Sequence, residues 1–270
     1  MVGSIGFAVD TWVAANDDFD HAGISIEELQ ERLQELGSER PPFESFVTSE
    51  WLIGWYSRFA LGKFVDQTSA TCSFDSPEFS AALQMCKDWG QSGGTETLGQ
   101  RCVLEFENIQ DIIRIGTIGE LYHDNYCYVG FPTSSGNGSM FELLSCFAIS
   151  AQGDKQEAAW EFIRFALGNL QPDGLLGVGI PASQSALDER LQFLIETGQT
   201  FLEFTHKIKP SDADAFRALI ENTSMVENSE QGILKIITDE SVSFFTGSKT
   251  ASEAAALIQN RVQLYLMENR

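Results

Sequence analysis

The stretch that decides the fold runs from residue 129 to residue 168 and reads VGFPTSSGNGSMFELLSCFAISAQGDKQEAAWEFIRFALG. It opens on the apolar end of a strand, crosses a loop of turn formers at 132–139 and returns as a second apolar run at 143–149. A helical period follows over 155–167. Strand, loop, strand and helix in this order predict a mixed α/β chain.

The regions before this stretch carry the same two kinds of signal. Apolar runs at 102–106 and 126–131 predict further buried strands of one sheet. A capping box at Ser25–Glu28 predicts a helix that ends at Gly37. Ser76 followed by Pro77 predicts a second helix that stops at Gly90.

The carboxyl-terminal region is helical by its apolar period. The predicted helices cover 183–197, 211–221, 226–246 and 250–267. The last opens with another capping box, Thr250–Glu253. We therefore expect the carboxyl half to be rich in helix.

Charge and composition exclude several functional classes. The 270 residues carry 17 Lys and Arg against 39 Asp and Glu, a net charge of −22. A field this negative repels the phosphate backbone, so we expect no nucleic-acid partner. No apolar run is long enough to predict a membrane span, and the amino end as written has no pattern of a signal peptide.

Motifs for metal or cofactor chemistry are missing from the sequence. The histidines His21, His123 and His206 stand in no ligand spacing, and no GxSxG motif occurs. The glycine-rich run 174–179 fits neither a P-loop nor a dinucleotide fingerprint and is better interpreted as a turn. We therefore expect no catalytic residue, metal or cofactor.

The five cysteines are odd in number and widely spaced, so they predict neither a metal knuckle nor a disulfide framework. They are Cys72, Cys86, Cys102, Cys127 and Cys146. The simplest interpretation is that they are small buried apolar residues.

Two functional alternatives remain open on residues alone. One is an intracellular hydrolase or transferase that uses Cys127, near His123, or the acidic residues Glu105 and Glu107. The other is a helical adaptor that binds a partner along 183–267.

An aromatic segment, Glu50–Tyr56 (EWLIGWY), offers a different chemistry. Aromatic faces beside a carboxylate suit a sugar ring, whose C–H face stacks while its hydroxyl groups need hydrogen-bond acceptors. Trp51 and Trp55 lie four residues apart, a spacing that also suits packing in a core.

Several stretches resemble one known family. Residues 129–132 (VGFP), 146–151 (CFAISA) and 155–165 (KQEAAWEFIRF) resemble the family-1 extracellular solute-binding proteins of ABC importers, typified by maltose- and multiple-sugar-binding proteins. Residues 64–79 resemble that family's approach to a helix, and residues 245–266 resemble its terminal helix. The resemblance covers nearly the whole chain in the family's order.

The resemblance implies a periplasmic-binding-protein-like type II fold that is represented mainly by its second lobe. Residues 1–145 would form the first part of the second lobe, and residues 146–194 would return into the missing first lobe. Residues 195–270 would be the closing helices of the second lobe. The chain then lacks its signal peptide and most of its first lobe. We therefore expect an apolar helix face and a strand edge without their native partner, and hence a tendency to associate.

By the same resemblance, the protein is a non-enzymatic substrate-binding component of an ABC transporter, and its solute is a carbohydrate. Glu50, Trp51, Asn108 and Gln110 fall where the family presents ligand contacts. The partners implied are the solute and the permease subunits. The location implied is extracellular or periplasmic, as a cell-surface lipoprotein.

Overall fold

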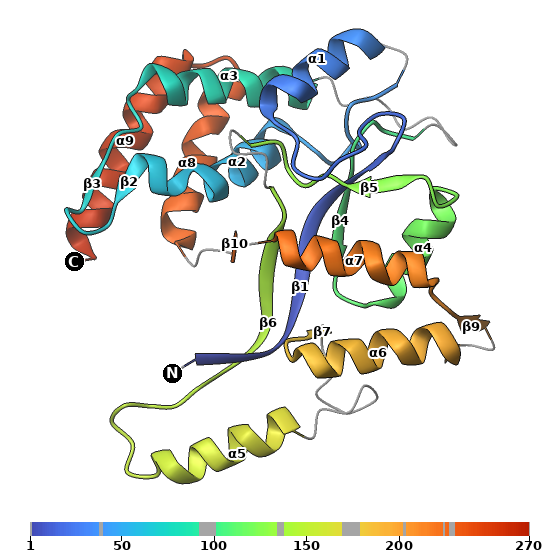
Figure 1. Ribbon diagram of the computed structural model, residues 1–270. Helices are drawn as coiled ribbons and strands as arrows, with labels where there is room; N and C mark the ends of the chain where they lie inside the picture. Colours follow the sequence, from blue (N-terminus) through green and yellow to red (C-terminus); the bar gives the residue numbers. More distant parts are fainter. Residues whose placement is uncertain are drawn as a thin grey trace. The chain divides into compact units, whose positions relative to one another are not determined.

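The computed structural model describes residues 2–37, 40–91, 101–133, 138–168, 179–201, 204–223, 225–226 and 230–269. The chain divides into two compact units. The sheet unit comprises 1–24, 106–130 and 137–227, and the helical unit comprises 25–105, 131–136 and 228–270. The helices and strands of both units are labelled in Figure 1. The expected division into 1–145, 146–194 and 195–270 stays a prediction.

The sheet unit is built on β1 (Val2–Ala15), the central strand of a six-stranded sheet within the described residues. The path runs β10 (Met225–Val226), β6 (Met140–Ala148), β1 and β4 (Glu105–Ile109), while β5 (Tyr126–Tyr128) and β7 (Ile180–Pro181) also pair with β1. β6 runs antiparallel to β1 and parallel to β10. The sheet is therefore mixed, with β1 as its spine.

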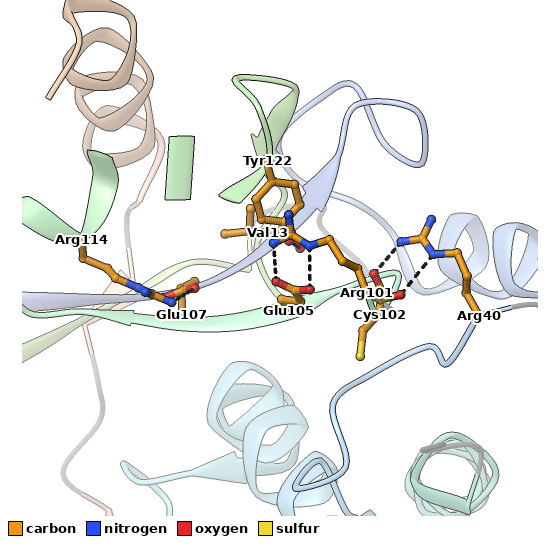
Figure 2. Close-up of polar contacts among 8 residues, drawn as sticks. All are labelled: Val13, Arg40, Arg101, Cys102, Glu105, Glu107, Arg114 and Tyr122. Carbon is orange, nitrogen blue, oxygen red and sulfur yellow. Dashed lines mark hydrogen bonds and ion pairs between the residues drawn. The ribbon is translucent and has the colours of Figure 1, made fainter. Parts of the chain in front are cut away.

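One face of β1 packs on helices. Val9 and Val13 are fully buried and share a core with α4 (Ile113–Leu121), α6 (Gln184–Glu196) and α7 (Pro210–Asn222). Successive side chains of a strand point to opposite faces, so the alternate residues Asp10 and Trp12 belong to the other face. The Tyr122 hydroxyl donates to the carbonyl of Val13 at 3.3 Å, which ties the end of α4 to the sheet; both residues are labelled in Figure 2.

A further helix of the sheet unit, α5 (Gln156–Gly168), exposes several large apolar side chains. Trp160 is 41%, Phe162 59% and Phe165 63% exposed, whereas Ile163 is buried. Phe162 meets Phe147 of β6 edge to face at 6.2 Å. A short hairpin, β8 (Gln199–Phe201) with β9 (Phe204–His206), completes this unit.

The helical unit contains α1 (Ile26–Leu36), α2 (Ser49–Phe64), α3 (Pro77–Gln91), α8 (Gln231–Phe245) and α9 (Ala251–Glu268). α2 packs on α3 and α8, and α9 packs on α3 and α8. Three phenylalanines, Phe64, Phe74 and Phe79, are in mutual ring contact at 4.9–5.4 Å between centroids. They fix the turn between α2 and α3 in the core.

Two glutamines of α9 hold the small hairpin of β2 (Val65–Asp66) and β3 (Thr71–Cys72). Gln259 accepts from the Phe74 amide at 2.6 Å and donates to the Cys72 carbonyl at 2.9 Å. Gln263 donates to the Ala70 carbonyl at 2.9 Å and accepts from the Cys72 amide at 3.3 Å. These bonds satisfy backbone groups that the two-residue ladder leaves over.

The mixed α/β character and both capping boxes are confirmed, with Ser25 and Thr250 as helix caps. The predicted start of the strand at 102–106 is wrong by three residues: β4 begins at Glu105. The amides of Val103 and Leu104 donate instead to the carbonyls of Pro41 and Pro42, both at 3.0 Å.

Two helix boundaries also differ from the prediction. The helix predicted over 226–246 begins only at Gln231, because Met225 and Val226 pair with β6. α3 continues through Gly90 to Gln91 instead of stopping before it. The glycine-rich run 174–179 lies outside the described residues except for Gly179.

The expected burial of the cysteines is confirmed for only two of them. Cys86 and Cys102 are buried, Cys72 and Cys127 are half-buried, and Cys146 is exposed; all five are free thiols. Cys146 lies on β6 near its end, in the same unit as the exposed helix α5.

Candidate functional site

The residues expected to contact ligand occupy two places in the fold. Glu50 and Trp51 lie in the first turn of α2, in the helical unit. Asn108 lies on β4 and Gln110 directly after it, in the sheet unit. The structure thus brings Glu50 together with Trp51, and Asn108 together with Gln110. Their role as ligand contacts stays a prediction.

The first turn of α2 is fixed by a local cap. Thr48 has extended backbone, and its hydroxyl accepts from the Trp51 amide at 3.3 Å. Its carbonyl accepts from the Leu52 amide at 2.9 Å. A threonine in this position satisfies an amide that the helix itself cannot bond. The carboxylate of Glu50 in the first turn stabilises the helix by its attraction to the positive end of the helix dipole. The helix start is therefore determined locally.

Trp51 belongs to a group of rings in contact, which we call the aromatic ladder; its members are Phe46, Trp51, Trp55, Phe59 and Phe131. Trp51 stacks on Trp55 with centroids 5.2 Å apart and planes inclined by 25°. Trp55 stacks in turn on Phe59 at 5.9 Å and on Phe131 at 6.0 Å. Phe59 and Phe131 lie parallel at 5.7 Å. The ladder follows the four-residue period of α2 from its first turn inward.

The ladder separates the two interpretations of the tryptophan pair. Trp55 is 4% exposed and Phe131 1%, so both are core residues. Trp51 is only half-buried, and Phe46, which is 48% exposed, meets it edge to face at 6.1 Å and 75°. Trp51 and Phe46 together form an aromatic corner at the start of α2. Such a corner can stack on the C–H face of a ring while the carboxylate of Glu50 accepts a hydrogen bond.

Asn108 joins three strands on the face of the sheet opposite the helix-covered core. Its side-chain nitrogen donates to a carboxylate oxygen of Asp10 on β1 and to Oε2 of Glu142 on β6, the second bond at 3.1 Å. Because an amide nitrogen carries two hydrogens, both are committed to these carboxylates, and Oδ1 is the atom that Asn108 can offer a ligand. Gln110 is exposed where the strand ends.

The acidic residues of the hydrolase alternative are engaged in ion pairs (Figure 2). Arg101 holds Glu105 with two bonds, at 3.0 and 2.8 Å. Arg114 holds Glu107 in the same two-pronged way, with one bond at 2.8 Å, and Glu107 is 7% exposed. Both oxygens of each carboxylate are occupied by a guanidinium group, so Glu105 and Glu107 act as structural partners. Arg40 donates to the carbonyls of Arg101 and Cys102, which fixes the approach to β4.

Cys127 has the wrong ionisation for a nucleophile. Its burial, with a smaller effect of the Asp20 carboxylate, raises the pKa of the thiol to about 11. A thiol with this pKa is protonated at neutral pH, and the thiolate is the reactive form. His123 lies exposed in a turn with φ of 53°, before β5.

Among the described residues, no group of three or more His, Cys, Asp or Glu side chains is arranged to hold a metal ion. Within the same part of the chain, none of the helices combines the length and apolar character needed to cross a membrane.

Sequence reasoning found Trp51 and Asn108 but missed their neighbours. Phe46 precedes the helix cap, and Phe131 follows β5, so neither shares the helical period that singled out Trp51. Asp10 lies 98 positions from Asn108 in the sequence, and only the strand order brings them together. The VGFP stretch contains Phe131, but it carried no sign of a contact with α2.

No family model matches the sequence, and no curated protein is significantly similar to it. Solved structures do match. A binding protein for cyclic alpha-maltosyl-1,6-maltose from Arthrobacter globiformis is 15% identical, with a TM-score of 0.57 over 99% of this chain and 72% of that one. An ABC-transporter solute-binding protein from Thermotoga lettingae, bound with alpha-D-tagatose, is 13% identical, with a TM-score of 0.55 over 98% and 72%.

A family-1 extracellular solute-binding protein from Alicyclobacillus acidocaldarius is 12% identical, with a TM-score of 0.57 over 98% of this chain and 72% of that one. At these identities the likeness is one of fold. The expected periplasmic-binding-protein-like fold is thus confirmed: nearly the whole chain has the fold of ABC-transporter solute-binding proteins, and it corresponds to 72% of each neighbour's length.

Proposed function

We propose that this protein is the substrate-binding component of an ABC importer and that its solute is a carbohydrate. The fold supports the first part, since the neighbouring structures are binding proteins for small solutes. The aromatic corner of Phe46 and Trp51 supports the second. Its exposed ring surface gives a sugar an apolar face to stack on, and Glu50 in the same helical turn carries an acceptor for hydroxyl groups.

Each candidate residue has a distinct role in this proposal. Trp51 stacks on the ring of the solute, and Glu50 accepts from a hydroxyl group. Asn108 offers its Oδ1 as an acceptor, because Asp10 and Glu142 occupy its amide hydrogens. Gln110, exposed after β4, can both donate and accept. None of these roles involves making or breaking a covalent bond, so the protein acts by binding alone.

Capture would proceed by closure of two lobes around the solute, as hinge motion allows in binding proteins of this architecture. The closed form would then deliver the solute to permease subunits. Capture of a solute for import takes place outside the cytoplasmic membrane, so we propose an extracellular or periplasmic location. The neighbouring structures include an extracellular and a periplasmic solute-binding protein.

The test is a titration calorimetry panel of mono- and oligosaccharides against the wild-type protein and the Trp51→Ala variant. We expect at least one sugar to bind and Trp51→Ala to weaken that binding by about tenfold or more, the loss of one stacked ring face. Trp160→Ala is the matched control, because Trp160 is also a partly exposed tryptophan but lies on α5. Equal affinity of the wild type and Trp51→Ala would remove Trp51 from the site. Binding of no carbohydrate would contradict the proposed solute class.

A further inference from the structure

The first turn of α2, which carries Glu50 and Trp51, lies against the last turn of α3. Gly90 lies at this contact. A β-carbon added at Gly90 would lie 2.3 Å from the Ser49 backbone nitrogen, 2.5 Å from the Ser49 hydroxyl oxygen and 2.7 Å from the Ser49 Cα. Two of these three atoms belong to the backbone, so no rotation of a side chain could relieve the overlap.

Gly90 occupies a position where glycine is otherwise a poor choice. It lies inside α3, one residue before the end of the helix. There glycine costs roughly 0.5–1 kcal/mol relative to alanine, because it loses more backbone freedom on folding. The close approach to Ser49 supplies the reason for a residue without a side chain. Gly62, near the end of α2, has no atom within 4 Å of its added β-carbon.

Ser49 directly precedes Glu50 and Trp51, so the position of its backbone determines where these two residues lie. Ser49 is 8% exposed and begins the helix that Thr48 caps. From Trp51 the stack continues to Trp55, whose ring is buried against Phe131. The aromatic ladder fixes the inner side of the Trp51 ring, and α3 fixes the backbone from which that ring projects.

We propose that Gly90 is a positioning residue for the carbohydrate site: its missing side chain lets α3 hold the first turn of α2 where Trp51 stacks on Trp55 and presents its outer surface to the solute. The inference rests on the proposed function only in that Trp51 contacts a carbohydrate. The stacking of Trp51 on Trp55 is a property of the protein without ligand and can be measured alone.

Two indole rings in contact give a coupled pair of bands in circular dichroism near 225 nm. The component that both Trp51→Phe and Trp55→Phe abolish reports their stack. We expect Gly90→Ala to remove at least half of this component while the helical signal is retained. Gly62→Ala, the matched glycine control on α2 itself, should leave the component unchanged.

An unchanged component in a folded Gly90→Ala protein would overturn the proposal, since the end of α3 would then have yielded instead of α2. Loss of the component in Gly62→Ala would overturn it too, because the stack would then respond to any change along the helix. For the sugar that the calorimetry panel identifies, Gly90→Ala should weaken binding by about tenfold. If no sugar binds, the proposed function fails while the dichroism still decides the role of Gly90.

Should Gly90→Ala fail to fold, hydrogen exchange of the wild-type protein decides. The amide of Glu50 belongs to the helix start and is not one of those that Thr48 bonds, so fraying makes its exchange fast unless packing prevents it. Protection equal to that in the middle of α2 supports the proposal. Exchange as fast as at the first turn of α5 would contradict it.

Discussion

Trp51 owes its orientation to rings that come from three separate places in the sequence. Phe46 precedes the helix, Trp55 lies one turn further along it, and Phe131 follows β5 and backs Trp55. Trp55 and Phe131 are buried, whereas Trp51 and Phe46 are not. A half-exposed ring held on a rigid stack loses little conformational freedom when it binds, which favours affinity.

Phe46→Ala should weaken carbohydrate binding by about 2- to 10-fold, because an edge-to-face aromatic partner contributes about 0.5–1.5 kcal/mol. The stability of the protein should change little, since the Phe46 ring is already 48% exposed. Titration calorimetry gives the affinity and thermal unfolding the stability. Phe193→Ala, a 39% exposed phenyl group on α6, is the control. An unaltered affinity in Phe46→Ala would confine the site to Trp51.

Burial controls the reactivity of the cysteines. It raises the pKa of Cys127 and of Cys72 to about 11, and Cys146 is exposed. We expect iodoacetamide at pH 8 to label Cys146 first, as followed by peptide mass spectrometry. The rate at Cys127 should keep rising with pH until about 11, because the thiolate is the reactive form. Rapid labelling of Cys127 at pH 7 would instead support the hydrolase alternative.

At the scale of elements, α9 stabilises the helical unit by polar as well as apolar contacts. Gln259 and Gln263 lie one turn apart and reach the backbone of the β2–β3 hairpin. On the neighbouring face of α9, Ile258 and Val262 are fully buried. The helix thus carries an apolar stripe and, beside it, a polar pair that determines where the hairpin lies.

Gln259→Ala should lower the free energy of unfolding by about 1–3 kcal/mol, because it leaves the Phe74 amide and the Cys72 carbonyl without their partner. Urea denaturation followed by circular dichroism measures the change. Asn260→Ala tests an exposed neighbour on the same helix and should alter stability by less than about 0.5 kcal/mol. Equal effects of the two substitutions would show that the hairpin contacts do not matter.

At the scale of the whole molecule, charge and exposed apolar surface act in opposite directions. The net charge of −22 makes copies of the chain repel one another. The rings of Trp160, Phe162 and Phe165 on α5 favour association, since exposed aromatic surface is removed from water when it is covered. The balance depends on salt, because salt screens the repulsion and leaves the apolar attraction in place.

We therefore expect sedimentation velocity to show association that increases with protein concentration and with salt between 0.05 and about 0.5 M, over which the Debye length shortens severalfold. Phe162→Glu should reduce it, since it adds a charge to the most central exposed ring of α5. Leu264→Glu, at a 59% exposed side chain on α9, is the control. Equal reduction by both would indicate a general effect of charge and not a role of α5.

The sequence predicted those features that depend on neighbouring residues. Ser25 and Thr250 cap helices because their hydroxyl groups reach amides three residues away, and such a bond can be inferred from the order of residues alone. The aromatic segment at Trp51 was recognised for the same reason, whereas the strand predicted at 102–106 did not include Asn108, which lies on β4. The mixed α/β character also followed, since apolar periods are local.

The tertiary structure decided what depends on residues far apart. β4 begins at Glu105 because Pro41 and Pro42 take the amides of Val103 and Leu104. Asn108 donates both amide hydrogens to Asp10 and Glu142 because β4 and β6 flank β1. Ser49 approaches Gly90 so closely that a β-carbon there would overlap with it. In each case the hydrogen bond or close contact joins distant segments, so its geometry exists only once the chain has packed.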